Sequence, residues 1–437
     1  MTLLTLTPRT AVSDRLTTLP VVVIGAGPVG LAAAAHLVER GIDVFVVEAG
    51  ERPAASVRLW GHTRLFSPWR YLIDPAARRL LEASGWTEPD PETMPTGAEL
   101  VADYLEPLAA LPEIGSRIRY GTRVVAVARE GMDRTRSAGR EQTPFLLRLD
   151  TVDNAVSEIT ARAVIDASGT YTTPNPLASS GWEPSGAGVV QDRITHALPD
   201  VNGLERSRFA GRHTTVVGAG HSAANTLIAL AELAEHEPDT RVTWLIRNPT
   251  AVRVSSSPDD DLPARAGLGA RIDQLVASGA ITKVDAFEIG AVEALTDGVR
   301  LIGMRRGEPA AHDTDLVVSA TGFRPDLGML REIRLDLDAI VEAPRRLAPL
   351  IDPNVHSCGT VEPHGFEELR HPEPGFFVVG MKSYGRAPTF LLATGYEQVR
   401  SVVAWLDGDM RAATAVQLEL PATGVCSTGD ASGSCCS

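Results

Sequence analysis

Short apolar runs, joined by glycine turns and amphipathic stretches, mark the beginning of the chain. Val21 to Ile24 is entirely apolar and ends at a glycine, which is typical of a buried strand of a parallel sheet. Pro28 to Arg40, rich in alanine and leucine and closed by Gly41, predicts a helix. Asp43 to Glu48 predicts a second strand that ends in an acid. Together these segments predict one strand–helix–strand unit.

The same order of elements returns in the middle of the chain. Thr214 to Val217 predicts a strand, Ser222 to Glu235 a helix, and Arg241 to Ile246 another strand. The two glycine turns begin at Gly25 and Gly218, 193 residues apart, which is far longer than the period of a solenoid repeat. The repetition therefore predicts two nucleotide-binding domains of the same kind.

Alternating and apolar segments predict further strands in the rest of the chain. Arg117 to Arg129 and Phe145 to Asp150 alternate as strands do, and the polar stretch Gly131 to Thr143 between them predicts a hairpin turn. Thr172 to Gly188, rich in proline, glycine and serine, predicts a crossover segment. Further buried strands are expected at Ala163 to Ala167, Leu316 to Ala320 and Phe376 to Val379.

These elements predict an α/β protein with two Rossmann-like dinucleotide-binding domains, the second inserted into the first. We expect the first domain to comprise residues 1–175 and, after the insertion, residues 316–410. The inserted domain takes residues 176–315. Residues 411–437 are small, polar and rich in glycine and serine, and predict a flexible tail that contains cysteines.

Composition and charge narrow the classes of partner. The 437 residues suffice for two to three domains, and the net charge of −14 argues against general binding to nucleic acids or anionic membranes. No apolar run approaches the roughly 18 residues of a membrane helix, and residues 1–20 lack a secretory signal, so we expect a cytoplasmic location. Four cysteines are too few for a disulfide scaffold. The sequence carries no signal for a particular oligomeric state.

The first glycine turn has the residue types that a dinucleotide requires. Gly25 permits the tight turn, Gly27 lets the backbone approach a diphosphate, and Gly30 allows close packing of helix on strand, while Pro28 opens the helix. The helix N-terminus offers N–H groups and partial positive charge to phosphates. Glu48, at the end of the next strand, can accept hydrogen bonds from ribose hydroxyls. The plainer alternative is a glycine-rich turn that binds no ligand.

The second glycine turn differs in the residue that closes it. Gly218 and Gly220 repeat the first two glycines, and Ala223 replaces the third. Arg247, not an acid, follows the next strand, and a guanidinium can pair with a 2′-phosphate that a carboxylate would repel. This favours NADPH over NADH, unless Arg247 merely caps a strand end at the surface. The turn residues His221 and Ser222 are expected beside the diphosphate.

Four motifs in this order resemble those of the flavoproteins with two dinucleotide-binding domains. Gly25 to Gly30 with Glu48 is similar to their FAD site, and the turn at Gly218 is similar to their NADPH site. Residues 166–169, followed by two prolines, and residues 320–326 resemble the two segments by which the chain crosses between the domains. The resemblance implies FAD and NADPH as cofactors, and cofactor-binding roles for Gly169, Thr321 and Gly322.

Within that superfamily the chain looks most like the flavin-containing (class B) monooxygenases. More narrowly, residues 375–386 resemble the monooxygenase-like flavoproteins of bacterial arsenic-resistance operons. The resemblance implies that Gly380, Lys382 and Thr389 bind the flavin cofactor. The sequence departs from both branches of the superfamily. Ile194 to His196 is no full copy of the fingerprint of the monooxygenases, and Met381 stands where disulfide reductases have an aspartate. No Cys-x-x-Cys pair lies near the flavin motifs, so the usual thiol chemistry of disulfide reductases is not expected.

The segment from Trp60 to Trp69 carries candidate active-site residues. It follows the first strand–helix–strand unit, where related enzymes bring a segment near the flavin ring. Arg64 and Ser67 are candidate catalytic hydrogen-bond donors, with Arg64 also a candidate cofactor ligand, and Phe66 with the two tryptophans can wall a dry pocket. Aromatic core packing with a satisfied arginine is the alternative.

Three cysteines near the end of the chain suggest a second kind of chemistry. Cys426, Cys435 and Cys436 are soft ligands that suit a thiophilic metal or metalloid such as trivalent arsenic or mercury. They can also pass electrons by thiol–disulfide exchange. The alternative is a tail with incidental cysteines.

The sequence as a whole favours an NADPH-dependent, FAD-dependent monooxygenase-like enzyme that uses molecular oxygen on a small substrate, with a link to arsenic. Its main rival is an NADPH-dependent flavoprotein reductase that passes electrons to the tail cysteines, to a thiophilic metalloid or to a partner protein. A third hypothesis is a redox-sensing or metal-binding protein that keeps FAD as structure. The intact second glycine turn and Arg247 count against it.

Overall fold

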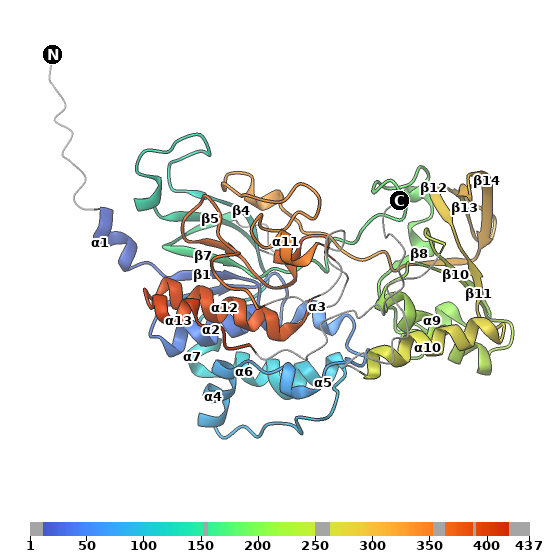
Figure 1. The fold of residues 1–437 in the computed structure, drawn as a ribbon, viewed down its shortest axis with the longest axis horizontal. Coiled ribbons are helices and arrows are strands. Elements are labelled where there is room, and N and C mark those ends of the chain that lie inside the picture. Colours follow the sequence, from blue (N-terminus) through green and yellow to red (C-terminus); the bar gives the residue numbers. More distant parts are fainter. Residues whose placement is uncertain (1–11, 152–155, 250–262, 353–362, 388–389, 419–437) are drawn as a thin grey trace, which may run out of the picture.

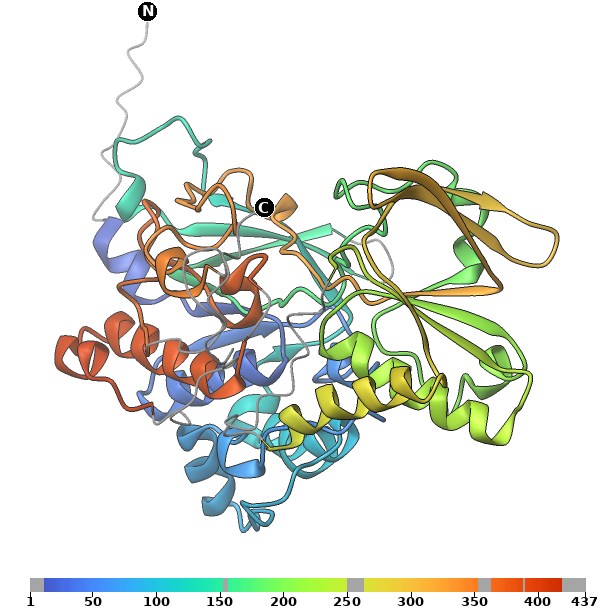
Figure 2. The same cartoon turned by 45° about the vertical axis from the view of Figure 1, so that its right-hand side comes forward.

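The computed structural model describes residues 12–151, 156–249, 263–352, 363–387 and 390–418. These residues form two α/β domains that lie side by side and are joined by two crossing segments (Figure 1). Figure 2 shows the same two domains from a second direction. The predicted fold class is confirmed.

The first domain is built on a five-stranded parallel sheet. Its strands, in spatial order, are β16 (Phe376–Val378), β7 (Ala163–Asp166), β1 (Val21–Ile24), β2 (Val44–Val47) and β3 (Ile118–Arg119). A three-stranded antiparallel sheet covers one side, made of β4 (Thr122–Arg129), β5 (Phe145–Thr151) and β6 (Val156–Ala161). The strands β1 and β7 are buried at every position, as the continuous apolar runs predict.

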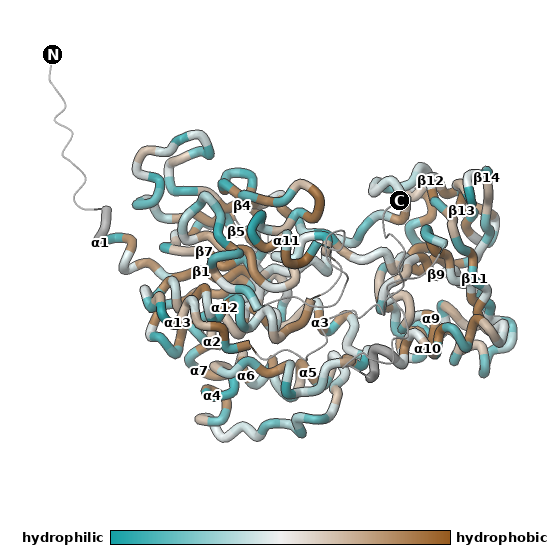
Figure 3. The backbone as a smooth tube through the Cα atoms, in the orientation of Figure 1, coloured by the Kyte–Doolittle hydropathy of each residue, from teal (hydrophilic) through white to brown (hydrophobic). Residues whose placement is uncertain are grey.

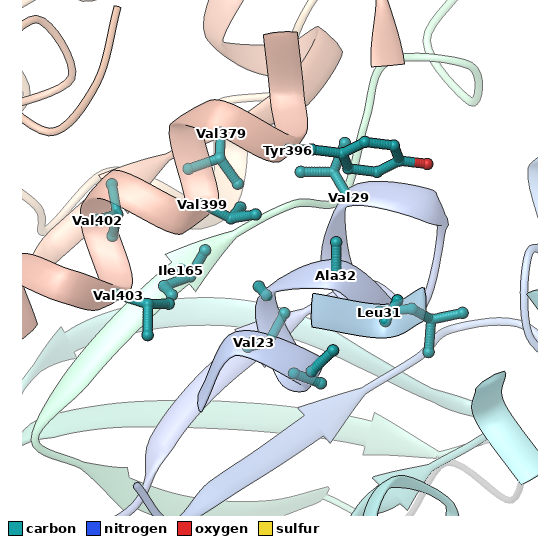
Figure 4. Packing of buried hydrophobic residues seen from close by; sticks show 14 of the residues in the cluster. Val23, Val29, Leu31, Ala32, Ile165, Val379, Tyr396, Val399, Val402 and Val403 are labelled. Atoms are coloured by element: carbon teal, nitrogen blue, oxygen red, sulfur yellow. The ribbon is translucent and has the colours of Figure 1, made fainter. Parts of the chain in front are cut away.

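Helices cover the other side of the first sheet. The longest are α2 (Pro28–Glu39) and α12 (Leu392–Leu406). Figure 4 shows Val399, Val402 and Val403 of α12 gathered near Ile165 of β7, with Tyr396 beside Val29 of α2. The remaining helices are α1 (Val12–Thr17), α3 (Ala55–Arg58), α4 (Pro75–Ala83), α5 (Gly97–Leu100), η2 (Val101–Leu105), α6 (Glu106–Ala110), α7 (Pro112–Gly115), α11 (Ala348–Ile351) and α13 (Met410–Thr414). Short 3-10 turns are η1 (Trp69–Tyr71), η3 (Arg140–Gln142), η7 (Gly328–Leu330) and η8 (Gly380–Tyr384).

The second domain repeats the plan on a smaller scale. Its parallel sheet has the order β11 (Thr282–Val284), β10 (Arg241–Leu245), β9 (His213–Val217), β15 (Leu316–Ser319) and β8 (Ile194–His196). Its antiparallel layer is β12 (Phe287–Ala294), β13 (Val299–Arg305) and β14 (Glu308–Thr314). The helices are α8 (Arg206–Phe209), α9 (His221–His236) and α10 (Pro263–Ala277), and the 3-10 turns are η4 (Ala187–Val189) and η5 (Gln191–Arg193). Figure 3 shows apolar residues concentrated on the inner strands and on the helices that face them.

Three sequence-based expectations are corrected by the structure. Residues 117–129 form two strands, because Gly121 turns the chain with a φ of +59° and sends β3 and β4 to different sheets. β15 pairs with β8 and β9, so the chain leaves the second domain after Ser319 and not at residue 316. Residues 411–418 are not a flexible tail: α13 packs on α12, and the Arg400 guanidinium donates to the carbonyls of Ala412 and Ala415.

Among the described residues, no helix has both the length and the apolar character needed to span a membrane.

Candidate cofactor and active site

The first glycine turn joins β1 to α2 and has one crowded side and one open side. A Cβ on Gly25, whose φ is +101°, would lie 2.8 Å from the carbonyl oxygen of Ala167, and one on Gly30 would lie 1.9 Å from that of Gly25. Both positions therefore require glycine for packing. A Cβ on Gly27 meets no atom within 4 Å. The open side of the turn is at the N-terminus of α2, which Pro28 begins, so a diphosphate can approach the backbone there.

Glu48 is held against this turn by its own carboxylate. Its Oε2 accepts a hydrogen bond from the N–H of Ala26 at 2.6 Å, and its Oε1 accepts one from Gly50 at 2.7 Å. The residue is buried, at 9% exposure. Each carboxylate oxygen keeps a further lone pair. The side chain is therefore fixed in place and can still accept hydrogen bonds from the hydroxyls of a ribose.

A buried ion pair lies at the end of β7, the strand next to β1. The Lys382 ammonium donates to the Oδ2 of Asp166 at 2.7 Å and to the hydroxyl of Ser168 at 3.0 Å, and Lys382 and Asp166 are both almost completely buried. The pair joins η8 to the end of β7, next to Gly169, whose φ is +70°. Gly380 donates its N–H to the Gln398 side chain. The sequence placed Lys382, Gly169 and Gly380 at the cofactor, and for all three that role stays a prediction.

The second glycine turn repeats the geometry of the first. A Cβ on Gly218, whose φ is +137°, would lie 2.2 Å from the carbonyl oxygen of Ala320, whereas one on Gly220 meets nothing within 4 Å. Ala223 replaces the third glycine and is fully buried on α9. The Trp244 indole on β10 donates to the Gly218 carbonyl at 2.7 Å. Sequence reasoning did not identify Trp244, because a tryptophan in an apolar strand carries no signal for this contact.

Arg247 lies exposed just beyond the end of β10. Its guanidinium makes a long contact of 3.5 Å with the carbonyl of Ser179. His221 and Ser222 begin α9, directly after Gly220. The second turn therefore presents backbone N–H groups at a helix N-terminus and has a guanidinium just beyond the end of the following strand. The roles of His221, Ser222 and Arg247 in binding NADPH stay predictions.

The two predicted crossing segments lie against each other. Asn175 donates its backbone N–H to the Gly322 carbonyl, and its amide donates to the Thr321 carbonyl. The hydroxyl of Thr321 donates in return to the Asn175 carbonyl at 2.9 Å, and the rings of Tyr171 and Phe323 stack at 4.8 Å. Thr321 and Gly322 thus tie the two connections between the domains together, and their predicted contact with a cofactor stays a prediction.

The segment from Trp60 to Trp69 is anchored along the first domain and reaches the second. Its backbone forms hydrogen bonds with residues 93–98, and Ser67 is buried at 7% exposure. Arg64 is exposed; its guanidinium donates to the Met94 carbonyl and lies 3.8 Å from Glu99. The ring of Phe66 lies 5.5 Å from the ring of His221. The segment therefore lies where the two domains meet, and the catalytic roles of Arg64 and Ser67 stay predictions.

Several predicted residues lie outside the described parts of the chain. These are Thr389, Cys426, Cys435 and Cys436. Within the described ranges, no group of three or more histidine, cysteine, aspartate or glutamate residues is arranged to hold a metal ion. The metal-binding hypothesis for the three cysteines thus stays a prediction.

Comparison with known proteins shows which family the chain belongs to. Residues 22–357 match the family model of the pyridine nucleotide-disulphide oxidoreductases. A ferredoxin–NADP reductase of Rhodospirillum rubrum is 25% identical over 91% of this chain and 94% of its own length. A flavin-containing monooxygenase of Arabidopsis thaliana (FMO GS-OX-like 2) is 26% identical, but the match spans only 51% of this chain and 49% of the plant protein.

Solved structures show the same fold at lower sequence identity. A bacillithiol disulfide reductase from Bacillus cereus superposes with a TM-score of 0.63 and 19% identity, over 89% of this chain and 99% of its own. A cadaverine monooxygenase from Erwinia amylovora, bound to FAD, also gives 0.63, at 16% identity, over 94% of this chain and 99% of its own. Both reductases and monooxygenases thus share this two-domain fold.

Proposed function

The chain belongs to the pyridine nucleotide-disulphide oxidoreductase family, and we propose that it is an FAD-dependent, NADPH-driven, monooxygenase-like enzyme that acts on a small substrate. One observation carries the proposal. The two domains have matching glycine turns, each open at its second glycine, and the strands that follow are succeeded by residues of opposite charge, Glu48 and Arg247. This difference supports our placing FAD at the first turn and NADPH at the second.

The residues of the first turn fit FAD. Gly27 leaves room for a diphosphate at the start of α2, and the carboxylate of Glu48 is held ready for ribose hydroxyls. When bound, the flavin supplies the capacity to accept a hydride and to react with oxygen. The protein's part would be to hold the two cofactors next to each other. Arg64 and Ser67 are our candidates for hydrogen-bond donors beside the substrate.

A matched pair of glycine substitutions tests the assignment. Gly27 (φ −80°) and Gly220 (φ −103°) have backbone angles that alanine adopts freely, and a methyl group at either place enters open space. Gly27→Ala should weaken FAD binding by about 1–3 kcal/mol, roughly 5- to 150-fold, because the methyl group blocks the diphosphate. Gly220→Ala should leave FAD content unchanged and weaken NADPH binding to a similar extent.

FAD content by absorbance and NADP⁺ affinity by calorimetry measure the two effects separately. Because each variant serves as the other's control for folding, loss of FAD in both variants or in neither would contradict the assignment.

The fate of the electrons separates the monooxygenase hypothesis from its rival. With the correct substrate, a monooxygenase consumes NADPH and oxygen in equal amounts and releases little peroxide. A reductase instead passes electrons to another acceptor, for which the tail cysteines Cys426, Cys435 and Cys436 are candidates. Replacing these three with serine should leave monooxygenase turnover unchanged and abolish transfer through the tail.

Trivalent arsenicals are the first substrates that we would test, because residues 375–386 resemble flavoproteins of arsenic-resistance operons. NADPH consumption that does not respond to them, or that appears entirely as peroxide, would refute the arsenic link. A cytoplasmic location stays a prediction.

A further inference from the structure

The two domains touch through a pair of rings beside the second glycine turn. Phe66, in the loop after α3, lies with its ring centroid 5.5 Å from that of His221, and the ring planes are inclined by 40°. His221 is the first residue of α9 and directly follows Gly220. In Figure 1, α3 and α5 lie on the side of the first domain that faces the second. Phe66 therefore reaches from the FAD domain to the helix start at which we place the NADPH diphosphate.

Backbone hydrogen bonds on both sides hold Phe66 in place. The N–H of Leu65 donates to the Pro95 carbonyl at 2.8 Å, and that of Trp69 donates to the Thr93 carbonyl at 3.0 Å. Trp69 is itself buried, at 4% exposure, whereas Phe66 is only half-buried. The position of the ring is thus set by the body of the first domain, and part of its surface is open to a ligand.

We propose that Phe66 and the ring of His221 form the wall against which the nicotinamide half of NADPH is held. The inference rests on the proposed function, because it takes the start of α9 as the diphosphate site. If the 2′-phosphate lies at Arg247, the diphosphate at the turn separates the two halves of the dinucleotide. The nicotinamide half then leaves the turn on the other side, and we place it against the ring of Phe66, which contacts the first residue of α9.

An aromatic wall at this place serves the transfer of a hydride. The hydride takes two electrons from NADPH to the bound flavin and leaves NADP⁺, and it requires the reacting atoms to approach to about 3–3.5 Å. A flat apolar ring stacks on nicotinamide with a favourable offset geometry. Phe66 is therefore a positioning residue: it orients the donor and takes no part in the bond changes.

Two ligands test whether Phe66 orients the nicotinamide half or only stabilises the protein around it. NADP⁺ carries both halves of the dinucleotide, whereas 2′,5′-ADP carries only the adenosine half with the 2′-phosphate. In calorimetry on the oxidised holoenzyme, Phe66→Ala should weaken NADP⁺ about 3- to 10-fold, the value of an aromatic contact, and leave 2′,5′-ADP unchanged. Arg247→Ala should weaken both ligands. Phe66→Tyr keeps the ring and should restore the affinity for NADP⁺.

A second variant and a double substitution guard against an effect on folding. Phe66→Leu keeps apolar volume without a flat ring, and should show the same selective loss of NADP⁺ affinity at wild-type FAD content. His221→Ala should act in the same direction, and its effect should not add fully to that of Phe66→Ala, because the rings share one contact.

Unchanged NADP⁺ affinity in both the alanine and leucine variants, or an equal loss of both ligands, would overturn the role of Phe66. A wild-type protein that binds neither ligand would refute the proposed function itself.

Discussion

Replacing Glu373 with glutamine would leave two buried guanidinium groups facing a neutral amide. The Glu373 carboxylate accepts hydrogen bonds from Arg129 at 2.8 Å, from Arg140 at 2.7 Å and from the backbone N–H of Arg334 at 3.3 Å. The side chains of Glu373, Arg129 and Arg140 are 0%, 1% and 4% exposed. Arg129 also lies 3.6 Å above the ring of Phe145. This cluster fastens the loop between β4 and β5 to the segment that enters β16.

The cost of the substitution follows from this burial. Burial opposes the charge on Glu373, yet the hydrogen bonds from Arg140 and Arg129 hold the pKa of its carboxyl below the ordinary value, so the anion is the form present. Burial also lowers the pKa of Arg129, which shows how much this cation depends on its partner. Removing one member of such a buried group costs about 3–5 kcal/mol, because the remaining charges stay buried and unpaired. We expect Glu373→Gln to be destabilised by about 4 kcal/mol.

Equilibrium urea unfolding, followed by circular dichroism, measures the loss. With an m-value of about 3 kcal/mol per molar, 4 kcal/mol lowers the urea midpoint of the first domain by more than about 1 M. Glu141→Gln, an exposed acid in the same loop, is the matched control and should stay within about 0.5 kcal/mol of wild type. A Glu373→Gln midpoint equal to that of the control would refute the reasoning, since the buried arginines would then need no anion.

Two further predictions concern the second turn and the response to acid. Trp244→Phe removes the hydrogen bond to the Gly218 carbonyl and should weaken NADP⁺ binding by about 0.5–1.5 kcal/mol at unchanged FAD content; equal affinities in calorimetry would contradict it. Burial lowers the pKa of His371 in the folded protein to about 4, although Asp336 acts in the opposite direction. In the unfolded chain this histidine has its ordinary pKa of about 6.5, so as the pH falls below that value the unfolded state binds the proton before the folded state does. Stability should therefore decline between about pH 6.5 and 4, by at most about 3 kcal/mol from this residue. Urea titrations across this pH range measure the free energy of unfolding, which should decline less steeply with falling pH in His371→Gln than in the wild type. His62→Gln, a substitution at an exposed histidine, is the control and should decline as the wild type does. The explanation would be ruled out by a pH slope that is the same in His371→Gln and the wild type.

Much of the fold could be predicted because the governing residues are local. β1 was predicted with its observed bounds, and β9 and β10 within one residue at each end. Both glycine turns lie where the motifs place them, because a turn with a φ of +101° at Gly25 or +137° at Gly218 requires glycine whatever surrounds it. Element type and turn chemistry are decided within a few residues, so the sequence displays them directly.

The wrong predictions concern features that depend on which segments lie next to each other in the folded protein. Alternation in residues 117–129 indicates strands, but it does not tell which sheet each strand joins. The apolar run at Leu316 fits either domain, and only its pairing with β9 assigns it to the second. The polar composition after residue 411 predicted a flexible tail, yet Asp409 caps α13 and Arg400 binds the carbonyls that follow.

The sequence by itself determined two dinucleotide folds and the opposite charges, Glu48 and Arg247, that distinguish them. The tertiary structure alone decided the long-range partners: Lys382 with Asp166, Glu373 with Arg129, and the ring of Phe66 on that of His221. The members of the two ion pairs are 216 and 244 residues apart. A glycine turn is required by its own backbone angles, whereas a pair of distant side chains meets only after the sheets and helices that carry them have packed.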